Sequence, residues 1–136
     1  MLRVQGIDLC YGAIQVLRDI HFEVQSGEIV SLIGANGAGK SSILGAISGI
    51  HPYTAGDILF EGQSVHKIPS FRLVGMGLAL VPEGRRVFSR MTVLENLEMG
   101  AFTRKDKGEL MDDLDKVFTH FPRLQERRKQ LAGTLS

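Results

Sequence analysis

The chain has 136 residues, and its 16 Lys and Arg residues against 15 Asp and Glu residues give a formal net charge of +1. With 43% hydrophobic and 23% charged residues it has the composition of a globular domain, which excludes a disordered chain. The balanced charge argues against nucleic acid as a partner, since nucleic acid attracts an excess of positive charge. Glycine is enriched, at 16 of 136 positions, where a usual content is about 7%. This content predicts places where the backbone turns sharply or approaches a ligand closely.

The cellular setting is suggested by what the sequence lacks. Cys10 is the single cysteine, so no internal disulfide forms, as expected in a reducing compartment. No apolar run reaches the roughly 18 residues of a membrane span, and the N-terminal stretch MLRVQGIDLCYG has no signal-peptide core. We therefore expect a cytoplasmic protein that reaches a membrane only by binding a partner.

The first third of the chain predicts two strands, then a strand and a helix around a glycine-rich loop. Residues 2–9 and 14–24 have the apolar spacing of strands. Residues 29–33, IVSLI, form a short run rich in β-branched residues, typical of a strand buried on both faces. A loop over 34–39 follows, and residues 41–50 carry apolar side chains at helical spacing.

The middle of the chain predicts short elements. Residues 57–60 indicate a strand after a turn, and residues 69–74 indicate a short helix. Residues 78–81, LALV, form a second strongly apolar strand that ends at Pro82.

The last third predicts helices. Thr92 and Glu95 have the spacing of a capping box, which starts a helix. Residues 107–121 repeat apolar side chains at helical spacing, with acidic residues early and basic residues late, as the helix dipole favours. Residues 123–129 form a basic segment, which we interpret as a solvated helix face.

The most informative segment is residues 34–41, GANGAGKS, which match the phosphate-binding pattern G-x-x-x-x-G-K-[ST]. Small residues and positive φ angles let successive backbone N–H groups surround an anion, and the N-terminus of the next helix adds further N–H groups. Lys40 would bring positive charge to the outer phosphates, Ser41 would offer a hydroxyl to Mg²⁺, and Ser42 would add a donor. The predicted phosphate-site residues are Gly34, Ala35, Asn36, Gly37, Ala38, Gly39, Lys40, Ser41 and Ser42.

The loop alone does not separate kinases, GTPases, motors and transporters, but other segments do. Tyr11 lies between the first two predicted strands, and a turn and strand cover residues 52–62. Residues 81–83, VPE, and 92–97, TVLENL, complete the pattern. In these segments and in its phosphate loop the chain resembles the ATP-binding subunits of ABC transporters, over essentially its whole length.

The resemblance implies a fold and a site. The fold is α/β: a P-loop NTPase core with an N-terminal antiparallel β part in residues 1–91, and part of a helical subdomain in residues 92–136. In this family an aromatic residue at the position of Tyr11 stacks on adenine, and Val16 lines the same face. The implied cofactors are ATP and Mg²⁺. The implied catalytic residues are Lys40 and Glu83, and the implied metal ligands are Ser41 and Glu83.

Two features depart from the family pattern. Glu83 stands where the family has Gln, so its catalytic role is open, and the alternative is a solvated loop acid. Leu135 and Ser136 resemble the start of the family's signature motif. We therefore expect residues 1–136 to be the N-terminal part of one longer ATPase domain, without the Walker B strand and switch histidine. Such a chain would bind ATP but hydrolyse it poorly by itself.

A narrower resemblance concerns function. Residues 82–88 and 91–97 look like those of the ATPase subunits of bacterial branched-chain amino-acid importers, and importers of urea or short amides share much of this sequence. The implied partners are membrane permease subunits, a second ATPase subunit and, indirectly, a periplasmic substrate-binding protein, with no nucleic acid. The implied location is the cytoplasmic face of the inner membrane. Two alternatives remain: a non-transport ABC-type ATPase that acts on ribosomes or nucleic acid, and a nucleotide-binding fragment without catalysis.

Two further groups of residues have simpler interpretations. Arg85, Arg86 and Arg90 either contact an acidic patch on a membrane subunit or form a solvated loop. The four histidines lack the spacing of metal ligands, and we assign them no function.

Overall fold

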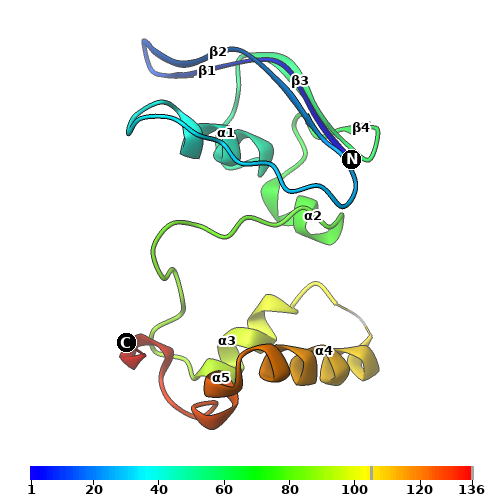
Figure 1. Cartoon of the computed structure of the whole chain (residues 1–136), viewed down its shortest axis with the longest axis vertical. Helices are drawn as coiled ribbons and strands as arrows, with labels where there is room; N and C mark the ends of the chain where they lie inside the picture. Colours follow the sequence, from blue (N-terminus) through cyan, green and yellow to red (C-terminus); the bar gives the residue numbers. More distant parts are fainter. Residues whose placement is uncertain (105, 136) are drawn as a thin grey trace. The chain divides into compact units, whose positions relative to one another are not determined.

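The structure, a computed structural model, describes residues 1–104 and 106–135 and contains two compact units, Met1–Leu80 and Val81–Ser136 (Figure 1). The subdomain boundary predicted after residue 91 concerns the longer domain and stays a prediction.

The first unit contains an antiparallel sheet, as predicted for the N-terminal part of the chain. β1 pairs with β2 through a hairpin that closes at Tyr11 and Ile14, and β1 pairs on its other side with β3. Gly12 has φ +61° in the hairpin turn, a backbone conformation that favours glycine. The strand order is β2-β1-β3-β4. The strands are β1 (Leu2–Tyr11), β2 (Ile14–Val24), β3 (Ala55–Phe60) and β4 (Gln63–Ser64).

The core of this unit lies between the sheet and two helices, α1 (Lys40–Ile47) and α2 (Ser70–Gly75) (Figure 1). Leu9 in β1 and Ile58 in β3 are fully buried, and Leu73 of α2 is 1% exposed. Burial of these apolar side chains provides the main driving force that holds α1 against the sheet. The core consists of Val4, Ile7, Leu9, Leu17, Ala46, Ile47, Ile58, Val65 and Leu73.

Two predicted strands do not form. Residues 29–33 and 78–81 have no regular secondary structure. Ile29 and Ile33 are each 95% exposed and Val81 is 92% exposed, so the prediction of buried strands is wrong for the described structure. The physical reason is that a strand is completed by a neighbour that pairs with its backbone N–H and C=O groups. In the described residues every strand pair lies within the antiparallel sheet, and none includes these two segments.

The second unit is helical, as predicted. Thr92 and Glu95 form the expected capping box at the start of α3: Thr92 Oγ1 accepts a hydrogen bond from the Glu95 N–H at 3.2 Å, and Glu95 Oε2 accepts one from the Thr92 N–H at 2.7 Å. The hydrogen bonds that the Glu95 carboxylate accepts from the Thr92 N–H and, at 2.9 Å, from the Thr92 hydroxyl hold the pKa of Glu95 below its usual value. The elements are α3 (Val93–Gly100), α4 (Lys107–His120), α5 (Pro122–Glu126) and a 3₁₀ helix, η1 (Ala132–Thr134).

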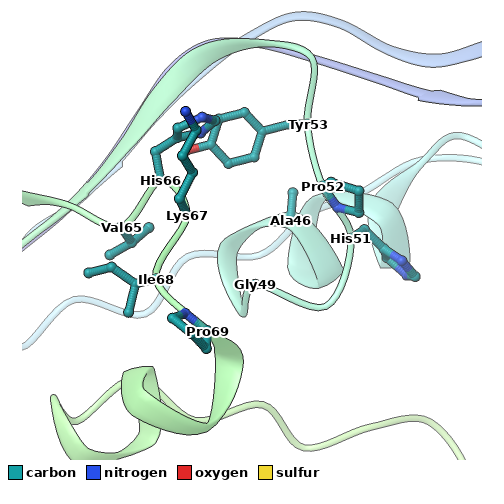
Figure 2. Close-up of a pocket in the computed structure, with 10 residues that line it drawn as sticks. All are labelled: Ala46, Gly49, His51, Pro52, Tyr53, Val65, His66, Lys67, Ile68 and Pro69. Carbon is teal, nitrogen blue, oxygen red and sulfur yellow. The ribbon is translucent and has the colours of Figure 1, made fainter.

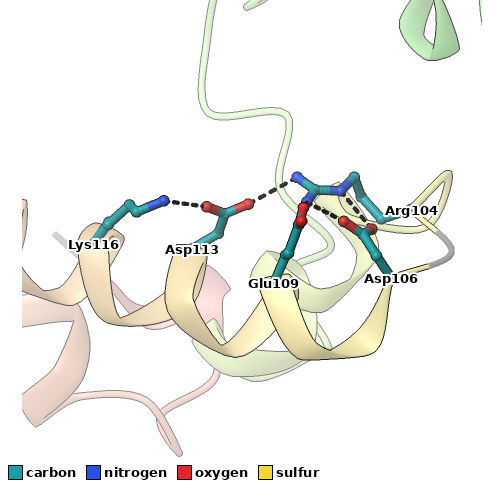
Figure 3. A network of polar contacts seen from close by, with 5 residues as sticks. All are labelled: Arg104, Asp106, Glu109, Asp113 and Lys116. Carbon is teal, nitrogen blue, oxygen red and sulfur yellow. Dashed lines mark hydrogen bonds and ion pairs between the residues drawn. The ribbon is translucent and has the colours of Figure 1, made fainter.

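An exposed ionic network surrounds the start of α4 (Figure 3). The Arg104 guanidinium pairs with Asp106 at 2.7 Å and with Asp113 at 2.8 Å, and Lys116 pairs with Asp113 at 2.9 Å. Hydrogen bonding to Arg104 lowers the pKa of Asp106, whereas hydrogen bonding to Asp106 raises the pKa of Glu109. Because its members are solvent-exposed, the network contributes little to stability.

The helices of the described part of the chain are all too short or too polar to cross a membrane.

Candidate functional site

The candidate site is the loop over residues 34–39, which leads into α1. Gly37 and Gly39 have φ of +83° and +86°, in the left-handed region where glycine is favoured, as predicted. Gly34 is different: its φ is not positive, but a Cβ atom there would lie 3.2 Å from the Cβ of Ala38. Glycine is therefore favoured at position 34, where a Cβ atom would have to push Ala38 aside slightly, and at positions 37 and 39 by backbone conformation.

Lys40 is the first residue of α1, and its side chain lies over the loop. The Nζ atom donates hydrogen bonds to the carbonyl oxygens of Gly34 at 2.8 Å and Ala35 at 2.7 Å. The ammonium group thus lies at the first two residues of the loop, although Lys40 itself directly follows the last residue of the loop. This places one positive charge at the centre of a tight backbone turn.

The start of α1 adds partial positive charge at the same place. Gly39 is the N-cap residue and has no side chain, the N-cap forms no side-chain hydrogen bond, and the first turn contains no acidic residue. Unpaired N–H groups and the helix dipole at such an end attract anions. Ser41 is exposed in this first turn, so its hydroxyl is available to a ligand.

The hairpin of β1 and β2 packs against the end of the loop. A Cβ atom at Gly39 would lie 2.7 Å from Leu17 Cδ2 and 3.3 Å from the carbonyl oxygen of Val16, so the loop touches β2 closely. Tyr11 donates a hydrogen bond from its hydroxyl to Ser42 Oγ at 3.3 Å. The structure therefore brings Tyr11, Val16 and Ser42 together with the loop. The roles assigned to them stay predictions.

Tyr11 remains 45% exposed, so one part of its ring is available for stacking. Its ring also contacts the imidazole of His51, with centroids 5.5 Å apart and planes at 87°. The sequence alone indicates no function for His51. A glycine at position 45, in the middle of the predicted helix, is the signal that could have indicated a side chain packed against α1.

Glu83 lies in the second unit and is exposed. Its backbone carbonyl accepts a hydrogen bond from Arg86 Nε at 3.4 Å. The predicted metal ligands Ser41 and Glu83 thus belong to separately described units, and their joint role stays a prediction. Among residues 1–104 and 106–135, no three His, Cys, Asp or Glu side chains are grouped as metal ligands.

A cavity of about 220 Å³ lies elsewhere in the first unit, at the C-terminal end of α1 (Figure 2). Its lining includes Tyr53 and His66, whose rings lie 4.9 Å apart. Burial, followed by the charge of Asp57, raises the pKa of Tyr53. None of the predicted site residues lines this cavity, so the loop is the better candidate site.

The arrangement around the loop suits a phosphate-containing ligand with an aromatic group. The backbone turn, the start of α1 and Lys40 provide donors and positive charge for the anion. The ring of Tyr11 offers a flat apolar surface beside them.

Comparison with known proteins gives the same interpretation. A family model for ABC transporters matches residues 17–136. The high-affinity branched-chain amino acid transport ATP-binding protein BraG of Pseudomonas aeruginosa is 49% identical over all of this chain and 58% of its own length. LivG of Escherichia coli, described in the same words, is 35% identical over 71% of this chain and 38% of its own length. The xylose import ATP-binding protein XylG of Photobacterium profundum is 34% identical over 74% of this chain and 20% of its own length.

Solved structures share the fold. A structure described as the ATP binding subunit of an ABC transporter aligns with all of this chain and 56% of its own, with a TM-score of 0.84 at 28% identity. A dimeric ATP-binding cassette bound to ADP and Pi aligns with a TM-score of 0.84 over all of this chain and 63% of its own, at 19% identity, which supports the fold alone. The chain spans 58% of the length of BraG.

Proposed function

The chain belongs to the ABC transporter family, and from that premise we propose that it is the ATP-binding part of the ATPase subunit that drives an importer. The observation that carries the proposal is the position of the Lys40 side chain. Its ammonium group is hydrogen-bonded to the beginning of the loop, and the loop leads into the start of a helix that no side chain caps. On ATP binding, Lys40 would exchange its hydrogen bonds to two carbonyl oxygens for hydrogen bonds to phosphate oxygens, which are stronger because the acceptors are charged as well as the donor. Tyr11 would stack on the base.

Mg²⁺ fits the same end of the loop. The hydroxyl of Ser41 is exposed in the first turn of α1, and Mg²⁺ commonly takes one or two protein oxygens together with phosphate oxygens and water. Bound Mg²⁺ neutralises charge on the phosphates. Glu83, at the position of the family glutamine, is proposed as a second oxygen ligand and as a group near the attacking water.

Hydrolysis by residues 1–136 alone is expected to be slow. Phosphoryl transfer needs an acid that holds Mg²⁺ and a group that positions water, and in this chain Glu83 is the one residue proposed for either role. An ATPase assay, with Lys40→Ala as the reference for background, should show no Lys40-dependent turnover, although calorimetric titration should show that the chain binds ATP. Robust turnover that disappears in Lys40→Ala would contradict this expectation.

The cargo is proposed to be branched-chain amino acids, because BraG and LivG are described as transporting them. At the cytoplasmic face of the inner membrane, the ATPase subunit would work with permease subunits and a second ATPase subunit, and indirectly with a periplasmic binding protein.

Introducing Lys40→Ala into the gene of the host should abolish uptake of labelled leucine, while Lys129→Ala, which replaces an exposed lysine outside the loop, should leave it unchanged. Loss of urea uptake with leucine uptake intact would reassign the cargo.

A further inference from the structure

The ring of Tyr11 has a neighbour that the proposed function does not use, the imidazole of His51. Their centroids lie 5.5 Å apart and their planes are at 87°, an edge-to-face pair. Such a pair favours one relative orientation of the two rings. His51 therefore restrains the orientation of the ring that is proposed to meet the base.

His51 is itself fixed against α1 at Gly45. The His51 N–H donates a hydrogen bond to the Gly45 carbonyl oxygen at 3.0 Å. A Cβ atom at position 45 would lie 2.0 Å from Cδ2 and 2.8 Å from Nε2 of the imidazole. The imidazole thus occupies space that a side chain at position 45 would need, and Gly45 lies inside a helix, where glycine is unfavourable. In Figure 2 the imidazole of His51 points away from Tyr53 and His66.

The second support of Tyr11 comes from the same helix. Its hydroxyl donates to Ser42 Oγ at 3.3 Å, and Ser42 lies three residues before Gly45, on the same face of α1. Helix α1 also begins with Lys40. Helix α1 therefore carries the phosphate-binding lysine and Ser42, and it holds His51 through Gly45.

We propose that His51 is a positioning residue for nucleotide binding, which acts through Tyr11 by holding its ring ready to stack on the base. Less side-chain freedom is then lost when the nucleotide binds. This inference rests on the proposed function, because it requires that Tyr11 meets the base. His51 is not proposed to touch the nucleotide.

The chain is well suited to a spectroscopic test, because it has no Trp and two Tyr residues. In a Tyr53→Phe background Tyr11 is the only source of tyrosine emission. Titration with Mg·ATP should quench that emission as the base stacks. Calorimetric titration with inorganic triphosphate, which has no base, measures the phosphate loop separately.

In this background His51→Ala should weaken ATP binding by roughly three- to tenfold, the strength of one aromatic pair. Its affinity for inorganic triphosphate should stay unchanged. His51→Phe, which restores an aromatic ring, should recover most of the ATP affinity. His66→Ala is the matched control, because it removes another histidine that contacts an aromatic ring, the ring at position 53, and it should change neither affinity.

Gly45→Ala offers an independent route to the same effect, since the three atoms nearest to its methyl group would all belong to the imidazole of His51. Gly45→Ala should weaken ATP binding when His51 is present. It should have little further effect when His51 has already been replaced by alanine. Equal additional losses in both chains would show that Gly45 acts otherwise and would overturn the proposed link.

The outcomes separate the two proposals. If the unmutated chain does not bind ATP, the proposed function fails. If it binds ATP and Tyr11→Ala weakens binding while His51→Ala does not, the inference about His51 fails alone. Equal loss of ATP and triphosphate affinity in His51→Ala would also overturn it, because a general structural defect moves both.

Discussion

Gly37 and Gly39 have nearly the same backbone conformation but different surroundings. A Cβ atom at Gly37 would meet nothing within 4 Å, whereas one at Gly39 would lie 2.7 Å from Leu17 Cδ2, and Leu17 is 2% exposed. The first glycine is needed for its positive φ alone. The second is needed for its φ and for the close approach of the loop to β2.

This difference predicts unequal costs of substitution. Gly37→Ala should lower the free energy of unfolding by ~1–2 kcal/mol, the cost of the left-handed conformation. Gly39→Ala should lower it by a further ~1–3 kcal/mol through overpacking against Leu17. Urea unfolding of the two variants measures both values, and equal losses would show that the loop does not pack on β2.

At this scale the sequence predicted the positive φ angles of Gly37 and Gly39 but not that of Gly34, which is not positive, and it did not predict the contacts of the loop with its neighbours. The roles of Gly37 and Gly39 follow from a pattern of adjacent residues, which local geometry makes interpretable. The contact of Tyr11 with His51 joins residues far apart in the chain, so no spacing rule could reveal it. The same holds for the packing of Gly39 on Leu17.

Among the elements, α3 has a start that the sequence specifies completely. Thr92→Ala removes the acceptor of the Glu95 N–H and should cost ~1 kcal/mol of stability. Urea unfolding followed by helical circular dichroism measures this loss. Thr119→Ala, at an exposed hydroxyl inside α4, is the comparison and should cost less; an equal or larger cost there would contradict the capping role of Thr92.

The capping box also predicts a pH dependence. Hydrogen bonds from Thr92 lower the pKa of Glu95 in the folded state, so ionised Glu95 stabilises the fold above its unfolded pKa of about 4.5. That contribution is lost as the pH falls through the lower folded-state value. The stability difference between the native chain and Glu95→Gln should therefore be largest near neutral pH and shrink on acidification. A difference that grows on acidification would reverse the assignment.

Helices and strands differed in how far they could be predicted. The start of α3 and the extent of α4 depend on residues three or four positions apart, and both were predicted correctly. Residues 29–33 and 78–81 have strand composition, but a strand is completed by a neighbour, and none pairs with them among the described residues. Composition predicts how a segment would pack when it is paired, and it does not provide the partner.

For the molecule as a whole, the unpaired segments leave apolar side chains in solvent. Ile33 is 95% exposed and Ile58 is fully buried, although both have the same side chain. Ile58→Ala should cost ~2–5 kcal/mol through the cavity it leaves, while Ile33→Ala should change stability by less than about 0.5 kcal/mol. Ile33→Ala should also reduce self-association in light scattering, because exposed apolar surface favours aggregation. Comparable stability losses at the two positions would mean that residues 29–33 are packed.

The central claim for the molecule is that its loop binds ATP through Lys40. Isothermal titration calorimetry with Mg·ATP tests this claim most directly, on the native chain and on Lys40→Ala, with Lys129→Ala as a control that also removes one positive charge. Two lost hydrogen bonds to charged groups, at about 1.5–3 kcal/mol each, predict that ATP binds Lys40→Ala roughly 100-fold more weakly or worse, while Lys129→Ala binds as the native chain does. Equal ATP affinity in the native chain and Lys40→Ala would contradict the account.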